Sequence, residues 1–172
     1  LPYTTPVAVQ SIDLAQFSQD DGTKITSPVM SSGLGIAAAY AGDVNGDGLD
    51  DIILGAPNVS LGGEAYLIFG GATGINGTLS VSNLDGTNGF CIFSANDPAA
   101  AQFGLSVSAV GDFNGDGLGD FIVGTNATES FLIFGKAQGF ANSLDVSAMT
   151  SSDGVRISGG VLYSGCTVSG GG

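Results

Sequence analysis

The stretch Asp43–Asp51 reads DVNGDGLDD, and it decides the fold of this chain because it returns at Asp112–Asp120 as DFNGDGLGD. Both copies follow the pattern D-x-N-x-D-G-x-x-D, and each is preceded by a Gly. Oxygen side chains at alternate positions around a tight turn let a short loop wrap a hard cation such as Ca²⁺. Mg²⁺ is a weaker alternative, because it prefers few protein ligands and keeps several waters. The sequence therefore predicts two calcium sites.

Each predicted site uses four side chains and one main-chain carbonyl group. The ten predicted ligands are Asp43, Asn45, Asp47, Leu49 and Asp51 in the first loop, and Asp112, Asn114, Asp116, Leu118 and Asp120 in the second. Asn-Gly and Asp-Gly pairs also form plain hairpin turns without any metal. Two copies with the same ligand types favour calcium over that alternative.

The residues after each loop exclude an EF-hand. An EF-hand requires a Glu at position twelve and flanking helices, whereas position twelve is Leu54 in the first loop and Val123 in the second. Residues 51–55 and 120–124 are short apolar runs that end in Gly. Such runs are typical of buried strands, so each loop is predicted to join two strands.

A repeat of nearly constant length surrounds the loops. Besides the loops, the short markers SIDL, TLSV and SLDV begin at residues 11, 78 and 143. They divide the chain into a first repeat of about 11–77, a second of about 78–142 and a truncated third of about 143–172. Each period contains about four short strand signals, the fourth covering both the marker and a later segment, residues 90–93 or 155–157. Radially stacked, four-stranded antiparallel blades of a β-propeller explain this pattern.

At this point the chain resembles the FG-GAP repeats of integrin α-subunit β-propellers. The resemblance rests on Phe103-Gly104, on Gly55-Ala56-Pro57 and on the acidic loops that lie in between. Two departures are Leu34-Gly35 in place of Phe-Gly and residues 124–126 in place of Gly-Ala-Pro. The resemblance implies calcium ions that rigidify hairpins on one face of the propeller.

The expected fold is all-β, a partial or open propeller. It contains about two complete antiparallel blades, preceded by the fourth strand of one blade and followed by the first strand of another, at residues 161–172. The chain has 16 acidic residues and only three strong bases, Lys24, Lys136 and Arg156, so its net charge is -13. This charge excludes nucleic acid as a partner. No apolar run is long enough for membrane insertion.

Several reactive groups are absent or isolated. The chain has no His, which excludes a Ser-His-Asp or Cys-His catalytic arrangement. Glu64 and Glu129 stand near predicted strand starts, where solvated edge charge is expected. Cys91 aligns with the solvent-facing positions of Lys24 and Arg156, and Cys166 aligns with a core strand. Two free thiols are therefore expected, with a disulfide as the alternative.

These observations favour a non-catalytic, calcium-binding module that works in adhesion or protein interaction outside the cell or at its surface. The protein or glycan ligand is not specified by the sequence. One alternative is the structural subunit of a surface filament or sheath, which would self-assemble through open blade faces and edges. Two others are an accessory propeller of a secreted hydrolase and a lectin-like glycan binder that uses loops such as 58–63.

Overall fold

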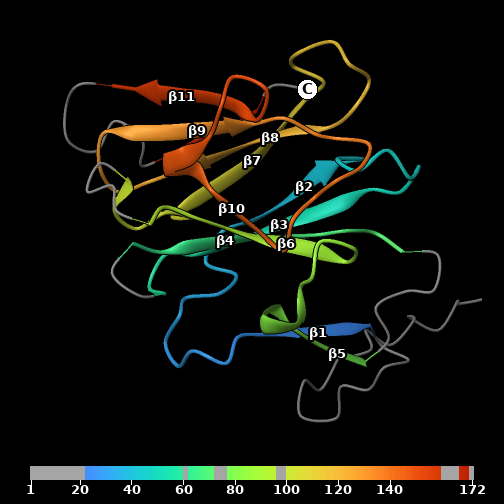
Figure 1. Ribbon diagram of the computed structural model, residues 1–172. Coiled ribbons are helices and arrows are strands. Elements are labelled where there is room, and N and C mark those ends of the chain that lie inside the picture. Colours follow the sequence, from blue (N-terminus) through green and yellow to red (C-terminus); the bar gives the residue numbers. More distant parts are fainter. Residues whose placement is uncertain (1–21, 60–61, 72–76, 96–99, 160–166, 171–172) are drawn as a thin grey trace, which may run out of the picture.

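Two stacked sheets form the body of the computed structural model, which describes residues 22–59, 62–71, 77–95, 100–159 and 167–170 (Figure 1). Each sheet has four antiparallel strands, and the first sheet has a fifth strand that is added in parallel at one edge. The first sheet contains β2 (Ala38–Gly42), β3 (Asp51–Ala56), β4 (Glu64–Ile68) and β6 (Gly89–Phe93). The second contains β7 (Ser106–Gly111), β8 (Asp120–Gly124), β9 (Glu129–Ile133) and β11 (Gly154–Ser158). The predicted all-β fold of repeated antiparallel blades is confirmed.

Short 3-10 turns, Val81–Asn83 and Val146–Ala148, are the helical elements of the described residues. None of the described segments forms a helix with the length and apolar character needed to cross a membrane. The described strands do not close into a ring. The chain thus forms part of a propeller, as its two complete blades predict.

The prediction that the fourth strand of each blade contains both the marker and the later segment is wrong for the marker and correct for the later segment. Residues 89–93 and 154–158 do form the outer strands, but the preceding markers leave their own sheet. The TLSV marker lies in β5 (Gly77–Ser80), which pairs in parallel with β1 (Thr23–Thr26), and the SLDV marker lies in β10 (Ser143–Asp145), which pairs in parallel with β6. An outer strand exposes unpaired main-chain groups, and the marker of the next repeat satisfies them.

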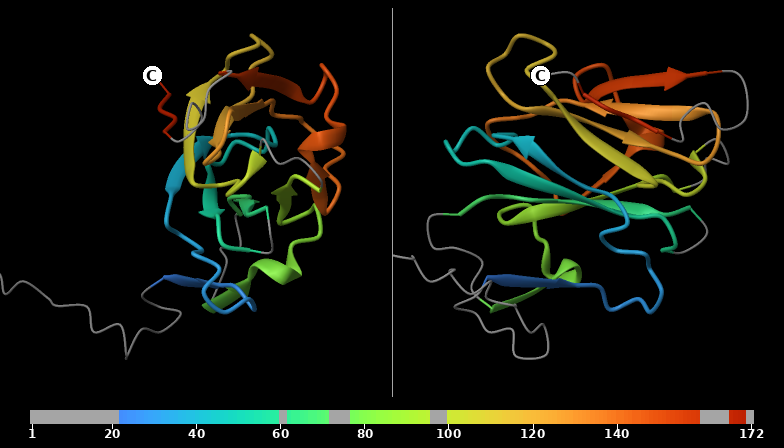
Figure 2. Two further views of the ribbon diagram at one scale, coloured as in Figure 1. Left: turned by 90° about the vertical axis from the view of Figure 1, so that its left-hand side faces the viewer. Right: turned by 180° about the vertical axis from the view of Figure 1, so that it is seen from behind.

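The flanking strands are present only in part. Strand β1 takes the place expected for the outer strand of a preceding blade, and Figure 2 shows the β1–β5 pair on the side of the first sheet away from the second. The first marker, residues 11–14, lies outside the described residues. Residues 167–170 carry no regular structure, but the Gly170 amide donates to the Ser108 hydroxyl at 2.8 Å, so this segment lies beside β7. Residues 161–166 and 171–172 are likewise outside the described part.

The main core lies between the two sheets. Ile53, Leu67 and Ile92 face the second sheet, whose Phe121 and Phe131 are fully buried against them. A second apolar cluster, with Ile68 and Leu79, packs on the other face of the first sheet, so β3 is covered on both faces and carries an unbroken apolar run.

Phe103 and Gly104 join the second blade to the first. The Phe103 ring is fully buried, 5.6 Å from that of Phe131, and its amide donates to Gly62 at 2.7 Å. Gly104 adopts a φ of 84°, and a Cβ at Gly55 would overlap its carbonyl oxygen. Main chain therefore meets main chain here, and only glycine fits.

Candidate metal centres

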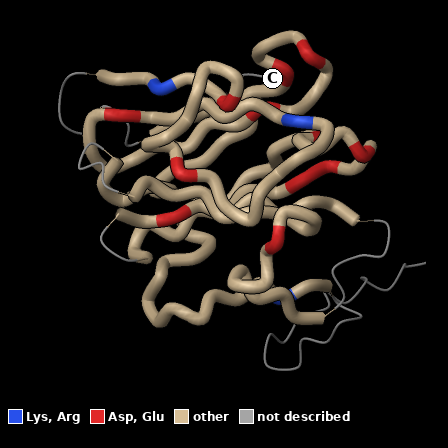
Figure 3. The backbone as a smooth tube through the Cα atoms, in the orientation of Figure 1, with Lys and Arg blue, Asp and Glu red and all other residues tan. Residues whose placement is uncertain are grey.

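The two acidic loops connect β2 to β3 and β7 to β8, at the same end of the blades (Figure 3). Each loop begins at a register shift, between Tyr40 and Gly42 in β2 and between Ala109 and Gly111 in β7. A bulge of this kind turns the strand and re-aims the residues that follow. The two copies of the motif thus leave their sheets in the same way.

Inside the first loop, the predicted ligands bind the loop's own amides. The two carboxylate oxygens of Asp43 accept from the amides of Asp47 and Gly48, at 3.0 and 2.9 Å. The Asn45 side-chain oxygen accepts from Asp47 at 2.9 Å, and Asp47 accepts from the Leu49 amide at 2.9 Å. These bonds turn the side-chain oxygens toward the inside of the turn, which is why Asp and Asn stand at alternate positions.

The second loop repeats this network. Asp112 accepts from the amides of Asp116 and Gly117, each at 2.9 Å, and Asn114 accepts from Asp116 at 2.9 Å. Asp116 accepts from the Leu118 amide at 2.9 Å. The second loop adds a bond from the Gly115 amide to Asp112 at 2.7 Å, but the four shared bonds recur at the same positions of the motif.

The ninth position of each loop is fully buried, unlike the others. The two oxygens of Asp51 accept from the amides of Val44 and Gly70, both at 2.8 Å, and Asp51 has no exposed surface. Asp120 accepts in the same way from Phe113 at 2.8 Å and Gly135 at 2.9 Å, with a longer bond from Asn114. Each aspartate therefore ties its loop to the end of the third strand of its blade.

Sequence reasoning predicted the ninth-position aspartates as ligands but missed their amide partners. Gly70 and Gly135 end the two Leu-Ile-Phe-Gly segments, so their repetition in the sequence was the available signal. A Cβ at Gly135 would stand 2.7 Å from the carbonyl oxygen of Gly119. The glycine is required because the third strand passes directly over the loop.

Burial raises the pKa of Asp51 to about 6, and the charges of Asp47 and Asp43 add to the rise. Hydrogen bonds from the Gly70 and Val44 amides oppose it. The cause is the loss of hydration around a carboxylate in the core. A positive charge in the loop would favour the ionised form of this group.

The donor chemistry of both loops fits a hard cation. The predicted ligands of each loop include three carboxylates and one side-chain amide oxygen within nine residues, and oxygen ligands are those that Ca²⁺ selects. A carboxylate oxygen that accepts one amide hydrogen keeps a second lone pair for a metal. Across the described residues, however, no group of three or more His, Cys, Asp or Glu side chains stands in a metal-binding arrangement. The ten residues stay predicted ligands on their chemistry.

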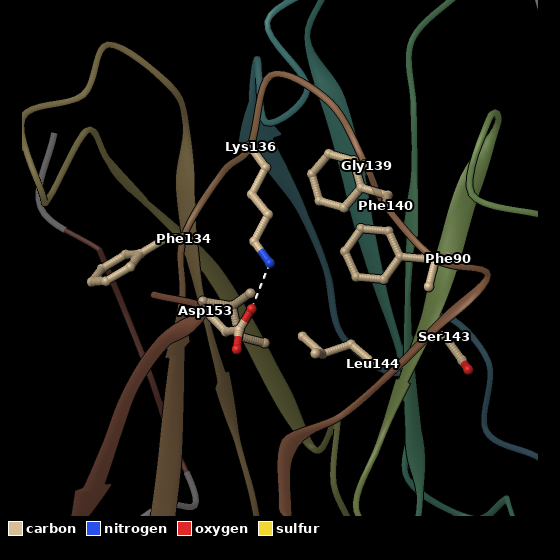
Figure 4. A pocket seen from close by; sticks show the side chains of 10 residues that line it. Phe90, Phe134, Lys136, Gly139, Phe140, Ser143, Leu144 and Asp153 are labelled. Carbon is tan, nitrogen blue, oxygen red and sulfur yellow. Dashed lines mark hydrogen bonds and ion pairs between the residues drawn. The ribbon is translucent and has the colours of Figure 1, made fainter. Parts of the chain in front are cut away.

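The first loop also contacts the second blade. The Asp43 carbonyl accepts from the Gly119 amide at 2.8 Å, and the Val44 carbonyl accepts from the Lys136 amide at 2.9 Å. The Lys136 ammonium bonds Asp153 at 2.5 Å across a cavity of about 120 Å³ (Figure 4). The loop is thereby fixed between two blades rather than on one.

Aromatic rings line the opposite side of this cavity. The Phe90 and Phe140 rings stack with centroids 4.9 Å apart, and Phe69 packs at 5.1 Å from Phe140. Figure 4 shows the Phe90 and Phe140 rings facing the Lys136–Asp153 pair. These three rings pack between the two blades near the first loop.

Both glutamates differ from their expected role as solvated edge charges. Glu129 is only 8% exposed and forms an ion pair with Arg156 at 2.5 Å. Glu64 is half-buried and accepts a hydrogen bond from the Tyr66 hydroxyl. The prediction was wrong because each carboxylate lies over its sheet, beside the third and fourth strands, instead of at a free edge.

Cys91 is a free thiol, half-buried rather than solvent-facing, with its sulfur 3.6 Å from Glu64. Its alignment with Arg156 is confirmed by the strand register, since both stand opposite an aromatic residue of the third strand, Tyr66 or Phe131. Cys166 lies outside the described residues. So do residues 60 and 61 of the loop at 58–63 that a glycan binder would use.

Comparison with known proteins supports the repeat that the two acidic loops indicate. The FG-GAP repeat family matches residues 36–74 and 103–131, and these two segments contain the two acidic loops. Two separate segments of the chain thus match the FG-GAP repeat model. The contacts of Gly104 with Gly55 and Ala56 therefore join the two matching segments. Proteins with these repeats, integrin α-chains among them, are generally non-catalytic.

Three similar proteins are integrin α-chains. Integrin alpha-PS2 of Drosophila melanogaster is 37% identical over 92 residues, which are 48% of this chain and 6% of that protein. Integrin alpha-M of Mus musculus is 37% identical over 91 residues, 52% of this chain and 7% of that protein. Integrin alpha-E of Mus musculus is 36% identical over 95 residues, which are 55% of this chain and 8% of that protein. The chain thus spans less than a tenth of the length of these relatives.

Proposed function

We propose that this chain is a calcium-binding extracellular β-propeller module that serves adhesion or protein interaction and has no catalytic role. The observation that supports it best is the doubled loop, which carries four oxygen side chains at the same positions in both copies and whose buried ninth aspartate ties the loop to the blade. FG-GAP repeats similar to those of integrin α-chains support the adhesion role. The repeat boundaries proposed from the sequence, at about 77/78 and 142/143, leave one loop in each complete repeat.

The carboxylates of each loop would bind the ion, and the ion would offset the repulsion between them. Asp43, Asp47 and Asp51 bring three formal negative charges into one turn, and such a cluster is costly without a counter-charge. A bound Ca²⁺ supplies that charge and accepts hard oxygen ligands. Because the first loop accepts hydrogen bonds from the Gly119 and Lys136 amides, an ion that fixes this loop would also stabilise its contacts with the second blade.

Calcium titration with a thermal melt tests the proposal. At millimolar free Ca²⁺, a site with a dissociation constant of roughly 0.1 mM adds about 1.4 kcal/mol to the free energy of unfolding. We expect excess EDTA to lower the melting temperature and Mg²⁺ to restore it poorly. Asp116→Asn should reduce the calcium effect, while Asp85→Asn, a surface change outside the loops, should leave it intact. Equal melting curves with calcium and with EDTA would refute calcium binding.

Self-assembly into a filament or sheath is a second proposal, favoured by the exposure of both outer faces. Tyr40 is 74% exposed and Ile36 60% on one side, and Val155 and Ile157 are more than 40% exposed on the other. Apolar groups of this size on a sheet face commonly mark interfaces. Sizing and negative-stain images over a range of concentrations test it, and a strictly monomeric particle would reject it.

A further inference from the structure

The second blade contains an arginine site built from three side chains. The Arg156 Nε lies 2.5 Å from a carboxylate oxygen of Glu129, and its guanidinium carbon lies 5.6 Å from the centre of the Phe131 ring. Glu129 and Phe131 both come from β9, and Arg156 reaches them from β11, the adjacent strand. A carboxylate beside an aromatic face is a favourable environment for a guanidinium group.

The first blade repeats two of these three side chains. The register of β4 and β6 places Glu64 where the second blade has Glu129, and Tyr66 where it has Phe131. The third position is Cys91, which stands opposite Tyr66 as Arg156 stands opposite Phe131. The first blade therefore keeps the groups that receive a guanidinium but carries a short, uncharged side chain in place of the arginine.

A pocket opens where the arginine would be. It has a volume of about 360 Å³, and Glu64, Tyr66 and Cys91 line it together with aliphatic side chains. Those side chains include Val59, Val81 and Leu84. Burial raises the pKa of the Cys91 thiol, so the thiol is neutral near pH 7 and Glu64 is the one carboxylate side chain of this set.

Glu64 has no cation of its own among the described residues. All three bases of the chain belong to the described part, where Lys136 pairs with Asp153 and Arg156 with Glu129. Lys24 is exposed on β1 and forms no described ion pair with Glu64. The Glu64 carboxylate has the Tyr66 hydroxyl and the Cys91 thiol as its partners, both neutral donors.

We propose that this pocket receives an arginine side chain from a partner protein. The guanidinium would bind the Glu64 carboxylate and lie against Tyr66, while its aliphatic stem would pack on the apolar wall, as long basic side chains commonly do. Arginine fits better than lysine because its planar group can bind a carboxylate and stack on a ring at once. The net charge of -13 would also speed the approach of a basic partner.

This inference rests on the proposed protein-interaction role and names the chemistry of the partner. The pocket uses residues of β4 and β6, with walls from residues 28–29, 59, 81–82, 84 and 142–143, whereas the calcium loops precede β3 and β8. The two proposals can therefore fail separately. A change at Glu64 should leave the calcium-dependent rise in melting temperature intact, and removal of calcium should leave the three pocket side chains present.

The test uses the full chain with saturating calcium and a blocked tripeptide, acetyl-Gly-Arg-Gly-amide, as the probe. NMR titration should show shifts of Tyr66 and Cys91, and Glu64→Gln should weaken binding roughly tenfold, the scale expected for loss of a charge-assisted hydrogen bond. The citrulline analogue of the probe should bind the original protein no more tightly than it binds the Glu64→Gln protein, because it lacks the guanidinium charge. Asp85→Asn removes one exposed charge elsewhere and should leave the affinity unchanged.

Cys91→Arg provides an independent variant, because it supplies the missing side chain within the chain itself. We expect it to abolish probe binding and to raise the melting temperature. The proposal is overturned if the probe shifts neither residue, if Glu64→Gln and Cys91→Arg bind it as tightly as the original protein, or if Asp85→Asn weakens it as much as Glu64→Gln does. Loss of probe binding with a normal calcium response would reject this inference alone.

Discussion

The buried aspartate at the ninth loop position should stabilise the blade even without a metal. In Asp120→Asn, one carboxylate oxygen is replaced by an NH₂ group, yet the amides of Phe113 and Gly135 bind different oxygens of the carboxylate. One of these two amides therefore loses its acceptor. Because Asp120 has no exposed surface, water cannot easily replace the lost bond, and a buried donor without a partner costs about 1–3 kcal/mol.

The measurement is urea unfolding of the full chain in excess EDTA, so that calcium cannot contribute. A loss of about 2 kcal/mol corresponds to a fall of roughly 4–8 °C in melting temperature for a chain of this length. Asp116→Asn is the matched control, since Asp116 is exposed in the same loop and its Leu118 bond can be kept by an amide oxygen. We expect that control to stay within about 0.5 kcal/mol of the original protein in EDTA.

Added calcium should stabilise both variants less than it stabilises the original protein. Both remove a predicted ligand charge, so both should show a smaller rise in stability when calcium is added. The reasoning is refuted if Asp120→Asn unfolds in EDTA at the same urea concentration as the original chain, or if Asp116→Asn loses as much stability as Asp120→Asn.

Two further predictions concern the contacts between and beside the blades. Gly55→Ala should destabilise the chain by about 1–3 kcal/mol, because its Cβ would overlap the Gly104 carbonyl oxygen, whereas Gly71→Ala meets no atom within 4 Å and should be nearly neutral; urea unfolding of both variants checks this. The pKa of Asp153 is lowered to about 2, chiefly by the hydrogen bond from Lys136 and then by those from Thr150. The unfolded chain binds more protons than the folded chain in this range, so the stabilisation is full above about pH 4 and is lost as the pH falls toward 2. The difference in unfolding free energy between the original protein and Asp153→Asn should shrink over that interval, and a difference that does not change with pH would contradict the assignment.

Much of the blade was predictable because its signals are local. The loop ligands, the apolar runs of β3 and β8 and the glycines that end them are each read within about ten residues. Strand β2 begins three residues later than the small-residue run at 35–40, and Ile36, which precedes it, is largely exposed. Such an offset arises because small residues carry little information on where pairing starts.

The errors concern partners that lie far apart in the sequence. Nothing within the SLDV marker indicates that β10 adds to the edge of β6, about fifty residues earlier, since strand pairing is set by the path of the chain between the blades. The Glu129–Arg156 pair spans 27 residues and depends on the register of β9 with β11. The alignment of Cys91 with Arg156 was correct, but the pocket that follows from it required the position of Glu64.

The parallel pairing of β10 with β6 has a consequence for synthesis on the ribosome. Strand β6 ends at Phe93, but the segment that covers its outer edge does not leave the ribosome until Ser143–Asp145 have been made. During that interval the nascent first blade presents an open edge, which is the feature of a sheet most prone to pair with other chains. The same delay applies to β1, which waits for β5. For β1 and β6, the edge is therefore covered only by the repeat that follows in the chain, so translation order and edge protection are coupled at both places.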